Sequence, residues 1–300
     1  MTKSFEYMKA ATVEVGKYDK LRFPVWASPK LDGFRASVQG GKMLTSSLMQ
    51  FPNLHVNKLF NRKELNGLDG ELIAGQPFGE GVYVRTSSAV TRVDGTPEVT
   101  FWVFDWIDPP RPYIERLDIF QKIVAKVGAS AQALPQVKVH NIEHLEMYLD
   151  RMMDLGYEGC CLRRADGGDF YKYGRSTMRE QYLMKLKPFE DSECIVIGIE
   201  EKMTNTNEEG NRGRRRSLKA GMVPAGTLGK MLVRDLKSGA TFFIGLGKMK
   251  HVEGAAIWKA KGKGTIGRTA KYKFQRVGMV TELPRQPIFL GWRQKFDLSK

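Results

Sequence analysis

The sequence predicts an α+β domain in residues 1–189 followed by an all-β barrel domain in residues 190–300. In the first part, apolar residues alternate in strand-like runs and also recur at helical spacing, which is typical of sheets mixed with helices. In the second part, short strands follow one another with a single helix among them, which is typical of a small antiparallel barrel. The length of 300 residues agrees with this division, because about 150 residues form an average domain.

In the first domain, two apolar runs at 21–27 and 34–38 flank a Lys-Leu-Asp-Gly turn, which places its lysine at the end of a strand that faces a cleft. Apolar residues spaced by three or four predict two long helices, of which the second begins at its cap Asn141 and ends at Gly156. The first of these two helices is predicted at 112–127. The other predicted elements are a helix at 52–60 and strands at 42–45, 68–73, 101–106, 157–163 and 183–188.

The second domain is predicted to contain five strands and one helix. The segment 201–224 has few apolar residues and carries four closely spaced arginines, so it is predicted to be a flexible basic loop that contacts phosphate groups, with a merely solvated loop as the alternative. The arginines are Arg212, Arg214, Arg215 and Arg216. The strands are predicted at 193–200, 227–234, 241–246, 270–277 and 286–291, and the helix at 250–261.

The charge balance indicates a polyanionic partner. A net charge of +15 favours nucleic acid or an anionic membrane surface. Nucleic acid is favoured, because the chain has no uninterrupted run of about 18 apolar residues that would span a bilayer. The first ten residues carry charges where a signal peptide needs an apolar core, so a cytoplasmic protein is expected.

Several familiar sites are excluded. Cys160 and Cys161 are adjacent and no Cys-x-x-Cys spacing occurs, so neither a zinc ribbon nor a disulfide framework is predicted. His140 and His144 match a zinc motif, but Asn141 as helix cap leaves His140 outside the helix. No Gly-Lys pair is followed by Ser or Thr, so a Walker-type phosphate loop is absent and a bound nucleotide needs another device.

The turn lysine, Lys30, is a candidate nucleophile. A lysine amine attacks only when unprotonated, and burial or nearby cations lower its pKa enough for that. Taken alone, a lysine beside an Asp-Gly turn is more often a solvated loop residue. Lys185 and Lys187 alternate with apolar residues and project to one face of their strand. Such a pair forms either a solvated edge or a site for an anion.

Together these elements resemble the nucleotidyltransferase superfamily of ATP-dependent DNA ligases, RNA ligases and mRNA capping enzymes. The Lys-x-Asp-Gly-x-Arg signature is met by Lys30, Asp32, Gly33 and Arg35. The later motifs of the family are matched in order over nearly the whole chain. They are Asp69-Gly70-Glu71, Phe104-Asp105, Glu158-Gly159 with Arg163, and Lys185-x-Lys187.

The resemblance implies a nucleotidyltransferase (ATP-grasp-like) adenylation domain followed by an OB-fold barrel, as in a minimal phage-like ligase. In that family the motif lysine forms a lysyl-AMP with ATP, and the AMP then moves to the 5′-phosphate of nicked double-stranded DNA. Lys30 would be this nucleophile, and Lys185 and Lys187 would bind the α-phosphate. Arg293 in the last strand is the matching candidate for orienting pyrophosphate. A monomer is expected.

The resemblance also implies the remaining contacts of the site. Glu71 and Glu158 would contact the ribose or hold Mg²⁺ (or Mn²⁺), and Phe104 would stack on adenine. Arg35 would contact the nucleotide, and Asp32 together with Arg35 and the four arginines of the basic loop would contact the nucleic acid. Nucleotidyl transfer needs cations for the phosphate oxygens and carboxylates for the metal. Lys185, Lys187 and the metal are the nearby cations that are expected to depress the pKa of Lys30.

Two positions depart from the family pattern. Ser28 stands where ligases commonly have a glutamate that reads adenine, and Ser46 stands where they have an arginine. The alternatives are an RNA ligase, a GTP-using capping enzyme, and a nucleic-acid-binding protein whose catalytic site has decayed. NAD-dependent ligases are disfavoured, because three cysteines cannot form their four-cysteine zinc module.

Overall fold

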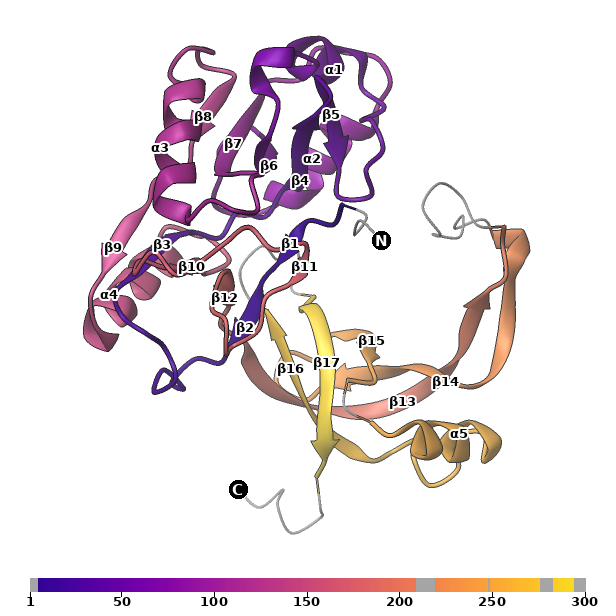
Figure 1. Cartoon of the computed structure of the whole chain (residues 1–300). Coiled ribbons are helices and arrows are strands. Elements are labelled where there is room, and N and C mark those ends of the chain that lie inside the picture. Colours follow the sequence, from indigo (N-terminus) through magenta and orange to yellow (C-terminus); the bar gives the residue numbers. More distant parts are fainter. Residues whose placement is uncertain (1–4, 209–218, 248, 276–282, 294–300) are drawn as a thin grey trace. The chain divides into compact units, whose positions relative to one another are not determined.

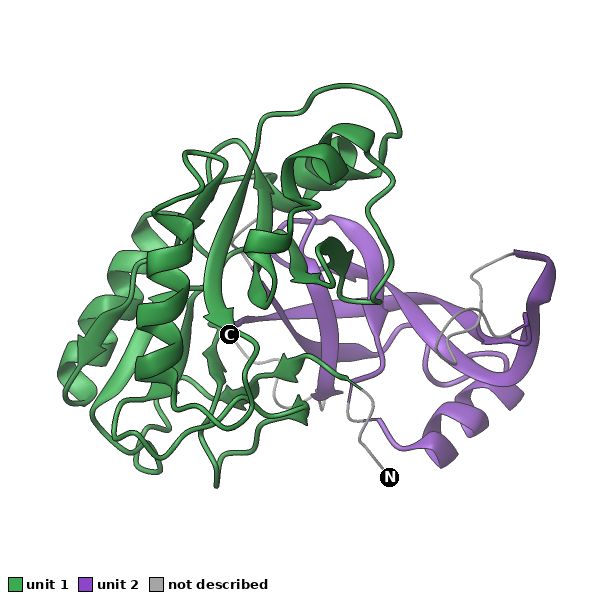
Figure 2. Ribbon diagram, turned by 45° about the horizontal axis from the view of Figure 1, so that its top comes forward, with its two compact units in different colours: residues 1–188 green, residues 189–300 purple. Residues whose placement is uncertain are grey.

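The chain forms two compact units, residues 1–188 and 189–300 (Figure 2). The computed structural model describes residues 5–208, 219–247, 249–275 and 283–293. The boundary between the units lies one residue before the predicted one. Within the described ranges, no helix is long and apolar enough to cross a membrane.

One sheet of the first unit has the strand order β2-β12-β10-β3-β9 (Figure 1). Its pairs are antiparallel except β12 with β2, which is parallel. Helix α4 packs on this sheet through Leu145, Leu149 and Met152. The bounds are β2 Ala11–Val13, β3 Val25–Pro29, β9 Val137–Val139, β10 Cys160–Arg164, β12 Met184–Leu186 and α4 Ile142–Asp154.

The second sheet of this unit has the order β5-β4-β6-β7-β8 and a separate core that three helices help to form. Its pairs are antiparallel except β7 with β8. A short parallel pair, β1 (Met8–Lys9) with β11 (Gly174–Arg175), completes the unit. The bounds are β4 Phe34–Gln39, β5 Lys42–Thr45, β6 Leu68–Ala74, β7 Val99–Trp106, β8 Ala131–Ala133, α1 Leu54–Phe60, α2 Val82–Thr91 and α3 Tyr113–Val124, with a 3-10 turn at Lys63–Leu65.

The helices with a clear apolar period are confirmed, and one helix was missed. Asn141 caps α4 as predicted, since its side chain accepts a hydrogen bond from the backbone N–H of His144 at 2.8 Å. Helix α2 was not predicted, because its sequence begins Val-Tyr-Val and contains Thr-Ser-Ser, residues that have modest helix propensity. It forms because Val82 and Val90 are buried against the sheet.

The second unit is a closed barrel of five strands in the order β13-β14-β15-β17-β16. Its core includes Val196, Met231, Ile244 and Tyr272. The strands are antiparallel except for β15 with β17. The bounds are β13 Glu190–Asn205, β14 Met222–Asp235, β15 Thr241–Gly245, β16 Thr269–Gln275, β17 Arg285–Trp292 and α5 His251–Lys259, with a 3-10 turn at Lys219–Gly221.

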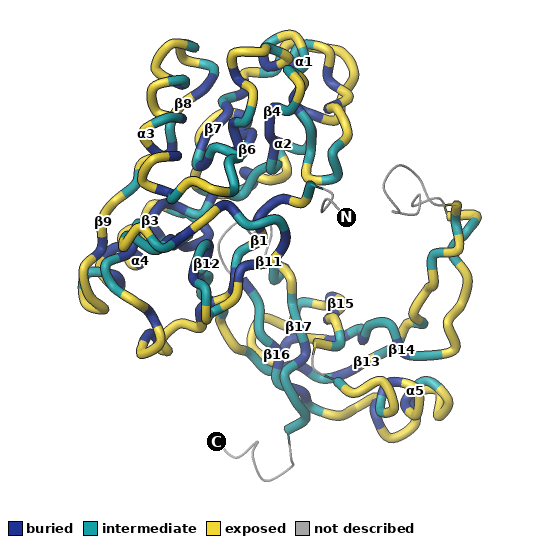
Figure 3. Tube along the Cα trace, in the orientation of Figure 1, coloured by how far each residue is buried: buried dark blue, intermediate teal, exposed yellow. Residues whose placement is uncertain are grey.

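The prediction of a loop over 201–224 is wrong at both ends of that segment. Strands β13 and β14 continue pairing as far as Asn205 opposite Met222, so a two-stranded ribbon replaces the outer parts of that loop. Most of this ribbon is exposed (Figure 3), which explains why no apolar pattern revealed it. Backbone hydrogen bonds hold the ribbon together, and these do not require a recognisable pattern of side chains. Arg212, Arg214, Arg215 and Arg216 lie outside the described residues.

Candidate active site

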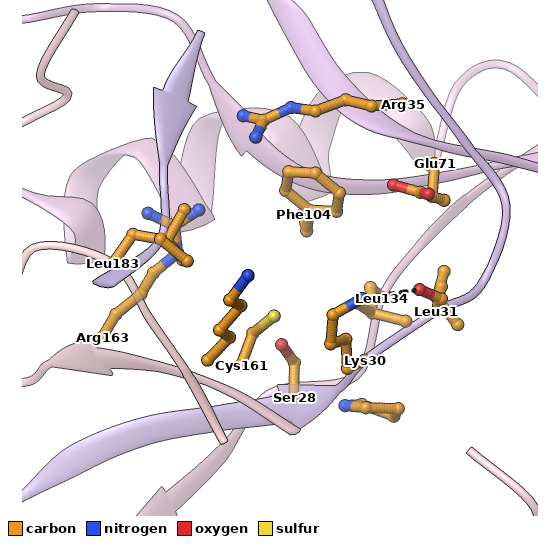
Figure 4. A pocket seen from close by; sticks show the side chains of 13 residues that line it. Ser28, Lys30, Leu31, Arg35, Glu71, Phe104, Leu134, Cys161, Arg163 and Leu183 are labelled. Carbon is orange, nitrogen blue, oxygen red and sulfur yellow. Dashed lines mark hydrogen bonds between the residues drawn. The ribbon is translucent and has the colours of Figure 1, made fainter. Parts of the chain in front are cut away.

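A cavity of about 220 Å³ in the first unit is lined by residues from both of its five-stranded sheets. Figure 4 shows Phe104 on one side of the cavity and Ser28 and Cys161 on the other. The sheet of β3, β10 and β12 supplies one wall, and the sheet of β4, β6 and β7 supplies the other. The lining consists of Ala10, Ser28, Pro29, Lys30, Leu31, Arg35, Glu71, Phe104, Leu134, Cys161, Arg163, Leu183 and Lys185.

Most of the predicted nucleotide site is brought together in this cavity. Lys30, Arg35, Glu71, Phe104 and Lys185 all line it. Glu158 and Lys187 do not line the cavity but lie next to it, because Glu158 is ion-paired with Lys30 and Lys187 is ion-paired with Glu158. Asp32, the last predicted member within the first unit, is not among the lining residues. Residues that are far apart in the chain thus meet between two sheets.

Lys30 follows the last residue of β3 directly. Its backbone N–H donates to the carbonyl of Gly159 at 2.9 Å, which ties the turn to the start of β10. Its Nζ donates to Glu158 Oε2 at 2.5 Å and to the backbone carbonyl of Leu31 at 3.3 Å. The Lys30 side chain is 23% exposed, so a reactant that enters the cavity can reach the amine.

The charge of Glu158 controls the proton of Lys30. Burial by itself would lower the pKa of Lys30, but acidic groups nearby, above all Glu158 through its charge and its hydrogen bond to Nζ, together outweigh burial and raise that pKa. The expectation that neighbouring cations depress the pKa of Lys30 is therefore wrong for the chain by itself. A carboxylate, and not an ammonium group, contacts the amine.

Glu158 is shared between two lysines. Its Oε1 accepts from Lys187 Nζ at 2.7 Å while its Oε2 accepts from Lys30. Burial acts to raise the pKa of Glu158, but the two ammonium groups prevail and lower it to about 2. The carboxylate is therefore ionised at neutral pH. Glycine at 159 lets the chain turn here, with a φ of +136° that side chains rarely adopt.

Glu71 faces Lys30 from the other sheet. Its Oε1 accepts from the backbone N–H of Gly33 at 3.2 Å. Burial raises the pKa of Glu71 to about 7, although Lys30 and Arg35 act in the opposite direction. A group with this pKa changes its charge near neutral pH, so a cation or nucleotide that enters the cavity can decide its state.

Arg35 is fixed in the cavity wall. Its Nε and Nη2 donate to the two oxygens of Asp69 at 3.0 and 2.6 Å, and its Nη1 donates to the carbonyl of Met8 at 2.7 Å. The guanidinium carbon lies 5.3 Å from the centroid of the Phe104 ring. A bidentate ion pair of this kind fixes both the position and the orientation of the Arg35 guanidinium.

The structure adds members that were not predicted as site residues. Ser28 and Cys161 are two of them. Cys161 in β10 is the direct partner of Ser28 in β3 and of the predicted Lys185 in β12, so the three side chains share the face that lines the cavity. The sequence marked Ser28 as a departure from the family pattern. Nothing in the sequence identified Leu134 as a lining residue, because an apolar residue outside a motif cannot be distinguished from an ordinary core residue.

The donor set can accept a divalent cation together with a nucleotide. In the part of the chain that is described, no group of three or more His, Cys, Asp and Glu side chains could hold a metal ion. Glu71 lines the cavity and Glu158 contacts Lys30 Nζ, so two carboxylates lie near the amine. Mg²⁺ commonly binds to one or two carboxylates plus substrate phosphates, so these residues fit a metal that arrives with ATP.

Other predicted site residues lie elsewhere. Arg293 belongs to the second unit, where its Nε donates to Glu193 Oε1 at 2.6 Å and its backbone N–H donates to the carbonyl of Thr269. Its role in the reaction therefore stays a prediction. The four arginines of the basic segment lie outside the described residues, so their contacts with nucleic acid also stay predictions.

Solved structures of DNA ligases are similar to this chain. A structure described as the DNA ligase-adenylate of Chlorella virus is 26% identical, covers 96% of this chain and 99% of that chain, and has a TM-score of 0.54. A structure of a Lig E DNA ligase, described as binding DNA with a minimal scaffold, is 23% identical, covers 98% and 100% of the two chains, and has a TM-score of 0.69. The second likeness concerns the fold alone.

A comparison with curated protein sequences gave no significant match. The family model described as the ATP dependent DNA ligase domain matches residues 8–187, which include every residue that lines the cavity. The chain therefore belongs to the family of ATP-dependent DNA ligases.

Proposed function

We propose that this ligase seals 5′-phosphate/3′-hydroxyl nicks in duplex DNA through a lysyl-AMP at Lys30 and a DNA-adenylate. The observation that carries the proposal is the placement of the Lys30 amine in a cavity that Glu71, Phe104 and Lys185 also line, with Glu158 in contact with the amine. This set offers a nucleophile, cations for phosphate oxygens and carboxylates for a metal.

In the first step, the lone pair of Lys30 Nζ attacks the α-phosphorus of ATP. An N–P bond forms, the bond between the α-phosphorus and the bridging oxygen breaks, pyrophosphate leaves and Nζ loses a proton. Lys185 and Lys187 neutralise charge on the transferring phosphoryl group. The ring of Phe104 offers a flat apolar surface for the adenine.

In the later steps, a 5′-phosphate oxygen of the nick attacks the same phosphorus and Lys30 leaves as the amine. The 3′-hydroxyl then attacks the 5′-phosphate, AMP leaves, and a phosphodiester bond is formed. Arg35, held by Asp69, stands at the cavity wall where it can meet either the nucleotide or the nick.

Lys30 must lose its proton before it attacks, and Glu158 opposes that loss. A divalent ion held by Glu71 and Glu158 would supply positive charge beside Lys30, which would lower the pKa of the amine and stabilise the phosphate charge.

We also propose that Arg293 orients pyrophosphate, that the ligase acts as a monomer, and that it works in the cytoplasm.

The proposal is tested by mass spectrometry of the full chain after incubation with ATP and Mg²⁺. The expected result is one AMP adduct on Lys30 and none in Lys30→Arg, because arginine keeps the charge but is not a nucleophile. Lys172→Arg is the matched control, since Lys172 is ion-paired with Glu180 outside the cavity, and its adduct should persist. An adduct that remains in Lys30→Arg would contradict the assignment.

A further inference from the structure

Behind the cavity, the first unit contains a cluster of four buried charged side chains. Arg116 of α3 and Asp105 of β7 are each 0% exposed, and Asp169 is 1% exposed. Arg163 of β10 is 4% exposed. Two positive and two negative groups therefore share one interior region. Arg116 is not among the residues that line the cavity.

Arg116 is joined to the cavity through Asp105. Its Nε donates to Asp105 Oδ1 at 2.8 Å, and the other oxygen of Asp105 lies 2.8 Å from Arg163 Nη2. Arg163 lines the cavity from the opposite sheet. Asp105 thus ties helix α3 and the sheet of β7 to the sheet of β10.

The same helix also contacts the backbone beside Phe104. The Tyr113 hydroxyl donates to the carbonyl of Phe104 at 3.1 Å, and the Arg163 guanidinium lies 4.5 Å from the centroid of the Tyr113 ring. Phe104 precedes Asp105 directly, so the position of the Asp105 carboxylate and the direction of the Phe104 ring depend on the same short piece of β7.

The cluster is not what maximal stability would select. Within the described residues, four of its buried polar atoms make no hydrogen bond of regular geometry: Asp105 Oδ2, Arg116 Nη2, Arg163 Nη1 and Asp169 Oδ2. Three of them are held by ion pairs only, since Asp105 Oδ2 lies 2.8 Å from Arg163 Nη2 and Arg116 Nη2 lies 3.5 Å from Asp169 Oδ2. Buried ion pairs often contribute less to stability than apolar side chains of the same volume. Buried charged groups whose hydrogen bonding is incomplete call for an explanation, and a role in function is one.

We propose that Arg116 is a positioning residue for the nucleotide cavity, which acts through Asp105 to hold Arg163 and Phe104 on its two walls. The gap between the walls receives a flat base only if it keeps its width. The guanidinium of Arg116 fixes the carboxylate that spans from one sheet to the other. This inference rests on the proposed function, because it assumes that a nucleotide occupies the cavity.

The test measures the Kd for ATP in full-length chains that carry Lys30→Arg, so that no AMP is transferred. Arg116→Met is expected to raise the Kd by about tenfold, the change that 1.4 kcal/mol produces. Arg116→Lys should raise it less, because it keeps a charge and one donor for Asp105. The failure of the proposed function would appear separately, as a missing Lys30 adduct in the unmodified chain.

A charge-balanced variant separates positioning from stability. Arg116→Met alone leaves an excess buried carboxylate, whereas Arg116→Met with Asp169→Asn restores the balance and leaves an acceptor for the backbone N–H of Tyr113. We expect the pair to recover much of the melting temperature lost in the single variant but not its affinity for ATP. Asp169→Asn alone is the matched control and should bind ATP as before.

Two results would overturn the inference. The first is an unchanged Kd for ATP in both variants that carry Arg116→Met. The second is a Kd that recovers together with the melting temperature in the charge-balanced variant, because Arg116 would then serve stability alone.

Discussion

At the scale of single residues, the contact between Glu158 and Lys30 sets the reactivity of the site. The carboxylate holds the amine of Lys30, the proposed nucleophile, in place and raises its pKa at the same time. Glu158 also holds Lys187, so the positions of both lysine side chains depend on one carboxylate. The proposed attack by Lys30 therefore requires that the charge of Glu158 be neutralised when ATP enters.

Glu158→Gln is predicted to move the rising limb of the pH profile of lysyl-AMP formation to lower pH. The substitution removes the negative charge that raises the pKa of Lys30, so the amine loses its proton earlier. The maximal rate should fall, because a carboxylate available to the metal is lost. The measurement is the single-turnover rate of adduct formation as a function of pH.

The control for that experiment is Lys187→Gln, which removes a positive charge near Lys30 and leaves Glu158 with one lysine. The rising limb should then move to higher pH. Shifts in the same direction for both variants would contradict the assigned role of Glu158.

Glu71→Gln is predicted to stabilise the chain more at pH 8 than at pH 5. The pKa of Glu71 is about 7 in the folded chain and about 4.3 in an unfolded one. Between these values the folded state binds more protons, so the free energy of unfolding falls as the pH rises. The difference in free energy of unfolding between the Glu71→Gln variant and the unchanged chain should therefore grow by about 1 to 3 kcal/mol from pH 5 to pH 8.

Denaturant unfolding of both chains at pH 5 and pH 8 measures that difference. Glu98→Gln, at an exposed glutamate, is the control, and its effect should be the same at both pH values. An advantage of Glu71→Gln that shrinks at pH 8 would show that Glu71 is better stabilised as a carboxylate than its burial indicates.

At the scale of the elements, a close approach of β10 to β12 places Glu158 between the two lysines. A Cβ on Gly159 would lie 2.2 Å from the carbonyl oxygen of Leu186. Gly159→Ala is therefore predicted to lower the free energy of unfolding by about 3 kcal/mol or more, because the strands must separate. It should also slow lysyl-AMP formation, since Lys187 and Glu158 would move apart.

Gly128→Ala is the matched control. Gly128 also has a positive φ, of +91°, but has no neighbour within 4 Å of a Cβ. Gly128→Ala should lower the free energy of unfolding by about 1 to 2 kcal/mol, from backbone strain alone, and should leave adduct formation unchanged. Thermal and urea unfolding measure both variants, and equal losses would argue against the collision.

Elements with a clear apolar period were predictable, and those that depend on distant partners were not. Helix α4 could be recognised from its cap and its apolar face, because both lie within its own sequence. Helix α2 and the outer ribbon of β13 and β14 could not. Burial against a distant strand stabilises the helix, and backbone pairing stabilises the ribbon.

At the scale of the whole molecule, two units with separate cores and a net charge of +15 must act on one polyanionic substrate. Changing Arg212, Arg214, Arg215 and Arg216 together to Ala is predicted to weaken binding to nicked DNA and to flatten its salt dependence. Each lost phosphate contact reduces the slope of log K against log salt by about 0.9. Adduct formation at Lys30 should persist, because it needs no DNA.

Binding titrations at several salt concentrations measure that slope. Changing the same four residues to Lys keeps the charge and should preserve most of the slope, which makes it the matched control. Equal slopes for the Ala variant and the unchanged chain would mean that the segment is only solvated.

The sequence by itself determined the two-part order of the fold, the identity of the candidate nucleophile and the residue types of the site, because these depend on local pattern and on motif order. Only the tertiary structure decided which groups touch. Glu158 and Lys30 are 128 residues apart, and their contact raises the pKa of Lys30 in the chain by itself, whereas the sequence had led us to expect that Lys185, Lys187 and a bound metal lower it. Charges interact through distance in space, and folding sets that distance.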